Sequence, residues 1–160
     1  MLSAAELILS LEKLLQLHKN LYQLTLQKTE ILKSENIDAL KELLKKEQMF
    51  VKAISQLEDE RIKQTVAFLG REDELSMSAC IEKATGSEKD KLKELEKDFK
   101  ETIDSLKATN ELNRELAKQA LQLVSMTLDM LMPQETEFNY NKPANKPIEK
   151  QRRSLFDSQA

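Results

Sequence analysis

Residues 7–32, LILSLEKLLQLHKNLYQLTLQKTEIL, decide the fold because they carry one long seam of mostly apolar residues. Side chains separated alternately by four and three residues lie on one face of an α-helix. The positions that follow this spacing are Leu7, Leu11, Leu14, His18, Leu21, Thr25, Lys28 and Leu32. The seam predicts a long packed helix over about residues 4–33.

A second long helix is expected over residues 37–69. Asn36 is a suitable N-cap, because its side-chain oxygen can accept a hydrogen bond from a free amide of the first turn. Gly70 is a natural stop, since glycine adopts the left-handed conformation without strain. The stripe expected to face the core consists of Leu40, Leu44, Val51, Ile54, Ile62, Thr65 and Phe68.

A third helix is expected to begin with Ser87 as its cap and to end at Pro133, which cannot continue a helix. Residues 71–87, which link it to the second helix, are expected to hold a short helix near residues 77–84. At 1.5 Å per residue the third helix spans roughly 67 Å and the second roughly 50 Å. About ten residues of the third helix therefore lack an intramolecular partner of matching length. If the second and third helices start at the same level, these residues lie at the C-terminal end of the third helix.

The predicted fold class is all-α, with three long antiparallel helices arranged as a helical hairpin plus a longer third helix. Short links make neighbouring helices antiparallel. The chain has only two glycines and is rich in Leu, Lys and Glu, which is typical of long helices. We expect a helical domain over residues 1–132 and a flexible tail over residues 133–160, which contains all three prolines.

Composition excludes several classes of protein. The net charge of −3 is not the basic footprint of a nucleic-acid binder. The sequence has no run of 18 apolar residues for a membrane span and no signal-peptide pattern at its start, so we expect a cytoplasmic protein without direct membrane insertion. A single cysteine, Cys80, cannot form an internal disulfide.

No arrangement of residues predicts catalysis, a cofactor or a metal site. His18 lies on the apolar seam, where a packed histidine is expected, and Cys80 is expected to be a buried small hydrophobe. One cysteine and one histidine cannot complete a four-ligand zinc site. The acids of residues 58–60 are consecutive, so they point in different directions, whereas Arg61 is expected to lay its stem along the core. We therefore expect that the protein is not an enzyme.

Asn110 and Asn113 interrupt the apolar seam of the third helix. A polar residue on such a seam can fix the register or the number of partners at some cost in stability. The alternative is that the helix turns both residues to the edge of the contact. The sequence leaves these two interpretations open.

The end of the third helix, residues 121–132, is unusually apolar and contains Met126, Met130 and Met132. Methionine is flexible and polarizable, so it repacks around varied partners, and exposed apolar patches usually mark binding sites. The alternative is that the methionines complete an internal core or a dimer seam. Phe138 and Tyr140 in the tail resemble anchors of a short binding motif, because disordered segments normally lack aromatics.

Three stretches resemble the FlgN family of flagellar type III export chaperones. They are LLKKEQMFVKAISQLEDERIK at residues 43–63, NELNRELAKQALQLVSMTLDMLMP at residues 110–133 and PQETEFNY at residues 133–140. The first is similar to the second-helix pattern of the family, which ends in Glu and Arg. The second is similar to its third helix with paired asparagines, and in the last a tyrosine follows a proline by seven residues.

The resemblance implies a chaperone that binds the C-terminal helical segments of the hook–filament junction proteins FlgK and FlgL. It would prevent their premature assembly and deliver them to the export apparatus. The substrate surface of the family corresponds here to about residues 116–131. The residues assigned to this surface are Leu116, Leu121, Leu123, Val124, Met126, Leu128, Met130 and Leu131. By position, Tyr140 is the counterpart of the tyrosine that docks to the export-gate protein FlhA, and Phe138 departs from some relatives.

The main alternative is a self-associating structural coiled-coil protein, in which the apolar end is covered by another copy of the chain. A homodimer is therefore left open. A membrane-surface helix is disfavoured, because residues 119–132 contain Asp129 and neither lysine nor arginine to attract anionic lipid.

Overall fold

The computed structural model describes residues 3–131. The predicted tail over residues 133–160, with Phe138 and Tyr140, lies outside the described residues, as does Met132. The chain divides into two compact units, Met1–Thr109 and Asn110–Ala160, and the last helix continues from one into the other.

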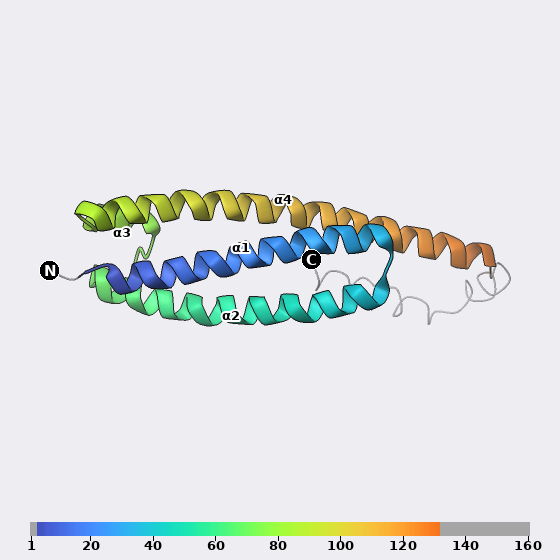
Figure 1. Ribbon diagram of the computed structural model, residues 1–160, viewed down its shortest axis with the longest axis horizontal. Helices are drawn as coiled ribbons and strands as arrows, with labels where there is room; N and C mark the ends of the chain where they lie inside the picture. Colours follow the sequence, from blue (N-terminus) through green and yellow to red (C-terminus); the bar gives the residue numbers. More distant parts are fainter. Residues whose placement is uncertain (1–2, 132–160) are drawn as a thin grey trace. The chain divides into compact units, whose positions relative to one another are not determined.

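The described residues form four helices and no strand (Figure 1). They are α1 (Ala5–Ser34), α2 (Ile37–Leu69), α3 (Met77–Lys83) and α4 (Gly86–Leu131). The predicted all-α class with three long helices is confirmed. The short α3 raises the number of helices to four, and α4 begins at Gly86 rather than after a Ser87 cap.

The ends of the first two helices follow the local sequence. The Asn36 side chain accepts a hydrogen bond from the backbone N–H of Ala39 at 3.1 Å, which confirms it as the N-cap of α2. Gly70 has a φ of 71°, in the left-handed region, and its N–H donates to the carbonyl of Val66 at 2.8 Å. Glycine adopts this conformation without a Cβ penalty, so α2 ends there.

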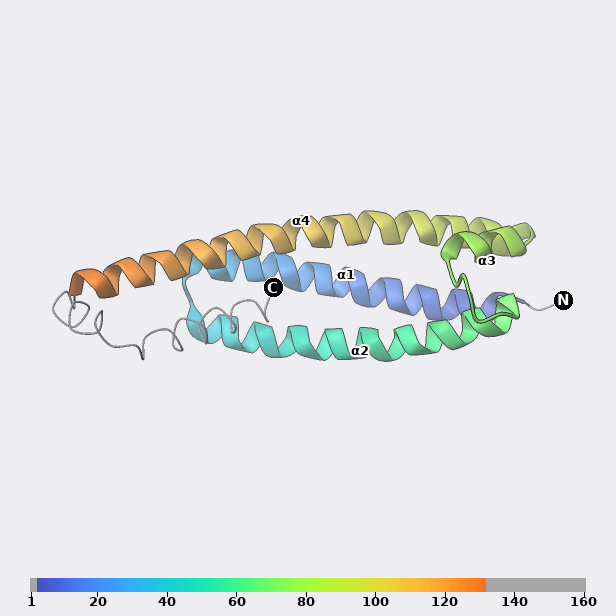
Figure 2. The same cartoon turned by 180° about the vertical axis from the view of Figure 1, so that it is seen from behind.

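The two helices α1 and α2 lie side by side as an antiparallel hairpin in both views (Figures 1 and 2). The predicted seam of α1 is confirmed, and its buried members include Leu7, Leu11 and Leu14. Its charged member, Lys28, reaches across to α2, where its Nζ lies 3.2 Å from Oε2 of Glu47. Because both side chains are largely buried, this pair is less screened by solvent than a surface pair and helps to fix the register of the two helices.

The predicted stripe of α2 was wrong in part. Val51 and Ile62 are exposed, at 53% and 38%, whereas Leu43 is buried at 4%. The positions of α2 that are buried or half-buried at regular spacing are Leu40, Leu43, Glu47, Phe50, Ile54, Leu57, Arg61, Gln64 and Phe68. Leu40, Ile54 and Phe68 of the predicted stripe belong to this seam, but the seam also contains Glu47, Arg61 and Gln64, whose burial an apolar pattern does not predict.

The core of the first unit lies where the hairpin meets α3 and the start of α4. It consists of Ala4, Leu7, Leu11, Leu15, Phe68, Cys80, Ala84, Leu92 and Leu95. The short α3 is held against the end of α2 by Lys83, whose ammonium donates to the carbonyl of Phe68 and lies 5.3 Å from the centroid of its ring. A cation at the C-terminal end of a helix is favoured by the helix dipole.

Leu92 is the natural test of this core, because it is fully buried. Replacing Leu92 by Ala should lower the free energy of unfolding by about 2–5 kcal/mol, through lost apolar contact and the cavity left behind. Denaturant titration followed by circular dichroism measures the change. The control is Leu123→Ala, at a side chain that is 56% exposed, which should change stability by less than about 0.5 kcal/mol. Equal effects of the two substitutions would contradict this core.

Candidate functional site

The end of α4 presents an apolar surface to solvent, which we call the apolar strip. Every residue from 121 to 131 is exposed. Its large apolar members are Leu121, Leu123, Val124, Met126, Leu128, Met130 and Leu131, with exposed fractions from 37% at Leu121 to 80% at Met130. Of the residues that the sequence assigned to a substrate surface, these seven are exposed and Leu116 is half-buried.

The apolar strip is wider than a single helix contact needs. Leu121, Val124 and Leu128 follow the three-and-four spacing of one seam, and Leu131 continues it. Leu116, Leu123 and Met130 are seven residues apart and form a second line beside it. A helix that packs on a core usually has an apolar stripe about 100° wide. The two lines together make the apolar face of α4 broader than that.

Little polarity interrupts this face. Within residues 116–131 the only charged side chains are Lys118 and Asp129. The hydroxyl of Thr127 donates to the carbonyl of Leu123 at 2.8 Å, so its hydrogen-bonding capacity is used inside the helix. A surface of this kind can bind an apolar face of another polypeptide.

The paired asparagines differ in their surroundings. Asn113 is buried, at 4%, whereas Asn110 is exposed. A buried polar side chain on a helical seam is the arrangement that specifies register. The structure thus favours that role for Asn113 and an edge position for Asn110.

A second feature lies within the first unit, where a cavity of about 530 Å³ opens among the helices. It is lined by Leu7, Leu11, Leu14 and His18 of α1, Ile54, Glu58, Arg61 and Thr65 of α2, Leu75, Met77, Cys80, and Phe99 and Ile103 of α4. This cavity was not predicted from the sequence, because it depends on how side chains of several helices pack.

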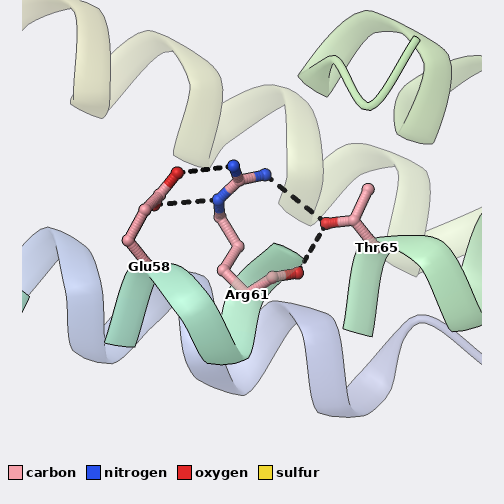
Figure 3. A network of polar contacts seen from close by, with 3 residues as sticks. All are labelled: Glu58, Arg61 and Thr65. Carbon is pink, nitrogen blue, oxygen red and sulfur yellow. Dashed lines mark hydrogen bonds and ion pairs between the residues drawn. The ribbon is translucent and has the colours of Figure 1, made fainter. Parts of the chain in front are cut away.

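The polar wall of the cavity is a hydrogen-bonded network centred on Arg61 (Figure 3). Its Nε and Nη2 donate to the two carboxylate oxygens of Glu58 at 2.9 and 2.5 Å, and its Nη1 donates to Oγ1 of Thr65 at 3.4 Å. The Thr65 hydroxyl in turn donates to the Arg61 carbonyl at 2.7 Å. Because Glu58 and Arg61 form a fork-shaped pair, their charges largely cancel. The prediction that Arg61 packs along the core is confirmed, since its side chain is only 20% exposed.

His18 and Cys80 also line the cavity, and both have packed environments. Nδ1 of His18 lies 2.8 Å from the carbonyl of Leu14, and its ring meets Phe99 edge-on with 5.7 Å between centroids. Cys80 is buried, at 2% exposure. Burial raises the pKa of the Cys80 thiol, although Arg61 and Arg71 oppose the shift. A thiol that keeps its proton is a poor nucleophile.

No group of three or more His, Cys, Asp or Glu residues within residues 3–131 could hold a metal ion. None of the helices in this range is long and apolar enough to cross a membrane.

The long helices and the apolar strip together define a helical protein whose exposed surface suits protein binding. The chain matches the family described as FlgN protein over residues 1–148, and it belongs to that family. The family is one of flagellar export chaperones, so the resemblance noted from the sequence is confirmed.

One curated relative is similar over its whole length. It is "Uncharacterized protein YvyG" of Bacillus subtilis (strain 168), 43% identical over 160 residues, which cover 99% of this chain and 100% of the relative. No solved structure matches the chain.

The Cys80 thiol provides a test of this arrangement by its pH dependence. Since burial raises its pKa, alkylation of the folded protein should reach half its maximal rate at a higher pH than alkylation of the chain unfolded in denaturant. Cys80 is the only cysteine, so mass spectrometry reports a single reaction. The folded chain holds this proton more tightly than the unfolded chain. The contribution of Cys80 to stability is therefore complete below the unfolded pKa and is lost as the pH rises through the folded pKa. The same dependence of alkylation rate on pH in the folded and unfolded chains would contradict the raised pKa of the buried Cys80 thiol.

Proposed function

We propose that this chain is a cytoplasmic chaperone that binds the C-terminal helical segments of FlgK and FlgL and delivers them to the type III export gate. The observation that carries the proposal is the apolar strip, in which every residue from 121 to 131 is exposed. A soluble protein rarely exposes so many neighbouring large apolar side chains unless another molecule covers them. Membership of the FlgN family supports flagellar export as the setting.

Binding would follow the helix-in-groove mode, with the apolar face of a client helix laid against the apolar strip. The two lines of apolar residues allow the client to contact α4 along more than one seam. Met126 and Met130 can repack around different side chains, which suits a chaperone with two clients. No covalent step is needed, because covering the client's apolar face is enough to prevent premature assembly.

Delivery would use a separate part of the chain. We propose that Phe138 and Tyr140, which lie outside the described residues, dock to the export-gate protein FlhA. Separate sites for the client and the gate would let the chaperone bind both at once.

The second candidate is a self-associating coiled-coil protein, in which a homodimer covers the apolar strip. It is favoured by one observation, the three-and-four spacing of Leu121, Val124, Leu128 and Leu131. The two functions differ in the partner that covers the same side chains, so binding and self-association can be measured on the same variants.

Client binding is tested by calorimetric titration with a C-terminal segment of FlgK. The variant carries Leu128→Asp and Leu131→Asp, at side chains that are 42% and 73% exposed, so its fold should be retained. Two charges facing an apolar client should weaken binding by about a hundredfold or more. The matched control is Met49→Asp in α2, at an apolar side chain that is 72% exposed and distant in sequence, which should bind as the parent does. Absence of binding by the folded parent, together with a stable dimer at low concentration, would support the second candidate.

Gate docking is tested with Tyr140→Ala and the cytoplasmic domain of FlhA. The substitution should abolish or strongly weaken the FlhA interaction, because a large aromatic anchor is removed. It should leave the affinity for the FlgK segment unchanged. Unaltered FlhA binding by Tyr140→Ala would contradict the proposed role.

A further inference from the structure

The apolar strip is joined directly to a part of the chain that carries apolar side chains of its own. The strip ends at Leu131, and residues 132–160 follow it outside the described part of the chain. Their sequence includes the stretch IEKQRRSLF at residues 148–156, which we call the basic segment. The same chain therefore contains both an uncovered apolar surface and a segment with the composition to cover it.

The spacing of the apolar residues in the basic segment suits contact with a helix. Ile148, Leu155 and Phe156 are seven and eight residues apart, a spacing that places side chains on one face of an α-helix. Pro147 stands immediately before this stretch, and proline is favoured at the first position of a helix. The pattern is that of a short amphipathic helix, which is the kind of partner that a helical apolar face binds.

The end of α4 is negatively charged. Within residues 119–131 the only charged side chain is Asp129, and the last turn of the helix contains no basic residue. The nearest basic residue of α4 in the sequence, Lys118, already pairs with Glu115 at 3.8 Å. The C-terminal end of a helix also carries a partial negative charge, so this end of α4 favours a cationic partner.

Charge distinguishes the basic segment from the aromatic residues that lie closer to the strip. Residues 132–141, which include Phe138 and Tyr140, contain two glutamates and no basic residue. Residues 142–156 contain one acidic residue, Glu149, and five basic residues, which are Lys142, Lys146, Lys150, Arg152 and Arg153. The basic segment is therefore the part of the chain that is complementary to the strip both in charge and in apolar pattern.

The link between the two is long enough for the basic segment to lie along the strip. Sixteen residues, 132–147, separate Leu131 from Ile148. An unstructured chain of this length spans roughly 20–25 Å. From Leu121 to Leu131 the strip is about 15 Å long, and a helix of nine residues is about 13 Å long. The segment can therefore turn back and cover most of the strip, antiparallel to α4.

Tethering makes a weak contact effective. A segment held by a short flexible link is present near its binding surface at an effective concentration on the order of 1 mM. A segment that by itself binds with a Kd of about 0.1 mM would then cover the surface about nine-tenths of the time, which lowers the apparent affinity for a competing ligand about tenfold.

We propose that residues 148–156 fold back as a helix onto the apolar strip and compete with the client for it. This inference rests on the proposed function, because the ligand that displaces the segment is the client helix. The segment shields the apolar side chains of the free chaperone and releases them to a client that binds more tightly. The residues proposed to dock to the export gate, Phe138 and Tyr140, lie in the link and take no part in this contact.

The test uses the full-length chain with the substitutions Leu155→Asp and Phe156→Asp, which remove the apolar contact. The matched control carries Ser154→Asp and Ser158→Asp, which add the same two charges at neighbouring polar positions. Hydrogen–deuterium exchange of residues 121–131 at low protein concentration measures the cover in the absence of a client. Calorimetric titration with the C-terminal FlgK segment measures the competition.

Exchange in residues 121–131 should be several-fold faster in the Leu155→Asp, Phe156→Asp variant than in the parent, because the uncovered helix end opens more freely. The FlgK segment should bind this variant about five- to tenfold more tightly than the parent. The control variant should match the parent in both measurements. Raising the salt concentration should move the parent part of the way towards the variant, because screening weakens the attraction between exposed charges.

Equal exchange in the parent and the Leu155→Asp, Phe156→Asp variant would overturn the proposal, and so would equal affinity of the two for the FlgK segment. Slow exchange that depends on protein concentration and not on the substitutions would place a second copy of the chain on the strip instead. The proposed function can fail separately. Absence of FlgK binding by both chains, with faster exchange in the variant, would contradict the client and support the cover.

Discussion

The first unit depends on the seam between α1 and α2. Its leucines provide apolar packing, and its charged members fix the register of the two helices. Lys28 and Glu47 face each other across it at 3.2 Å, in largely buried positions. A buried charge left without its partner is costly, so a shift of register by one helical turn would be penalised at this point. With the register fixed, Leu7 and Leu11 meet Phe68 at the end of the hairpin, where α3 and Leu92 of α4 complete the core.

In the same seam, Arg61 leaves space beside the helices instead of filling it. Its side chain turns to Glu58 and Thr65, and the cavity opens beside this network. An apolar residue at this position could have filled part of that space. The fold is thus tightly packed at one end of the hairpin and open along its side, while the end of α4 exposes a separate apolar surface.

Sequence periodicity predicted the helices well, because long amphipathic helices with clear caps are local features. The seam of α1 and the cap at Asn36 were confirmed. The stripe of α2 is predicted correctly at five of its seven positions and wrongly at Val51 and Ile62, because the charged residues Glu47 and Arg61 occupy buried or half-buried positions that an apolar pattern does not reveal. The cavity could not be predicted, since it arises from side chains of several helices that are distant in sequence. The exposed methionines of α4 were singled out from composition, and their role in binding stays a prediction.

The central claim is that a client helix binds the apolar strip. Hydrogen–deuterium exchange of the isolated protein, with and without the C-terminal FlgK segment, tests it most directly. The account predicts that exchange in residues 116–131 slows markedly when the segment is added, because a bound client suppresses local opening of the helix end. Exchange that is already slow in these residues at low protein concentration and does not change with the segment would contradict the account.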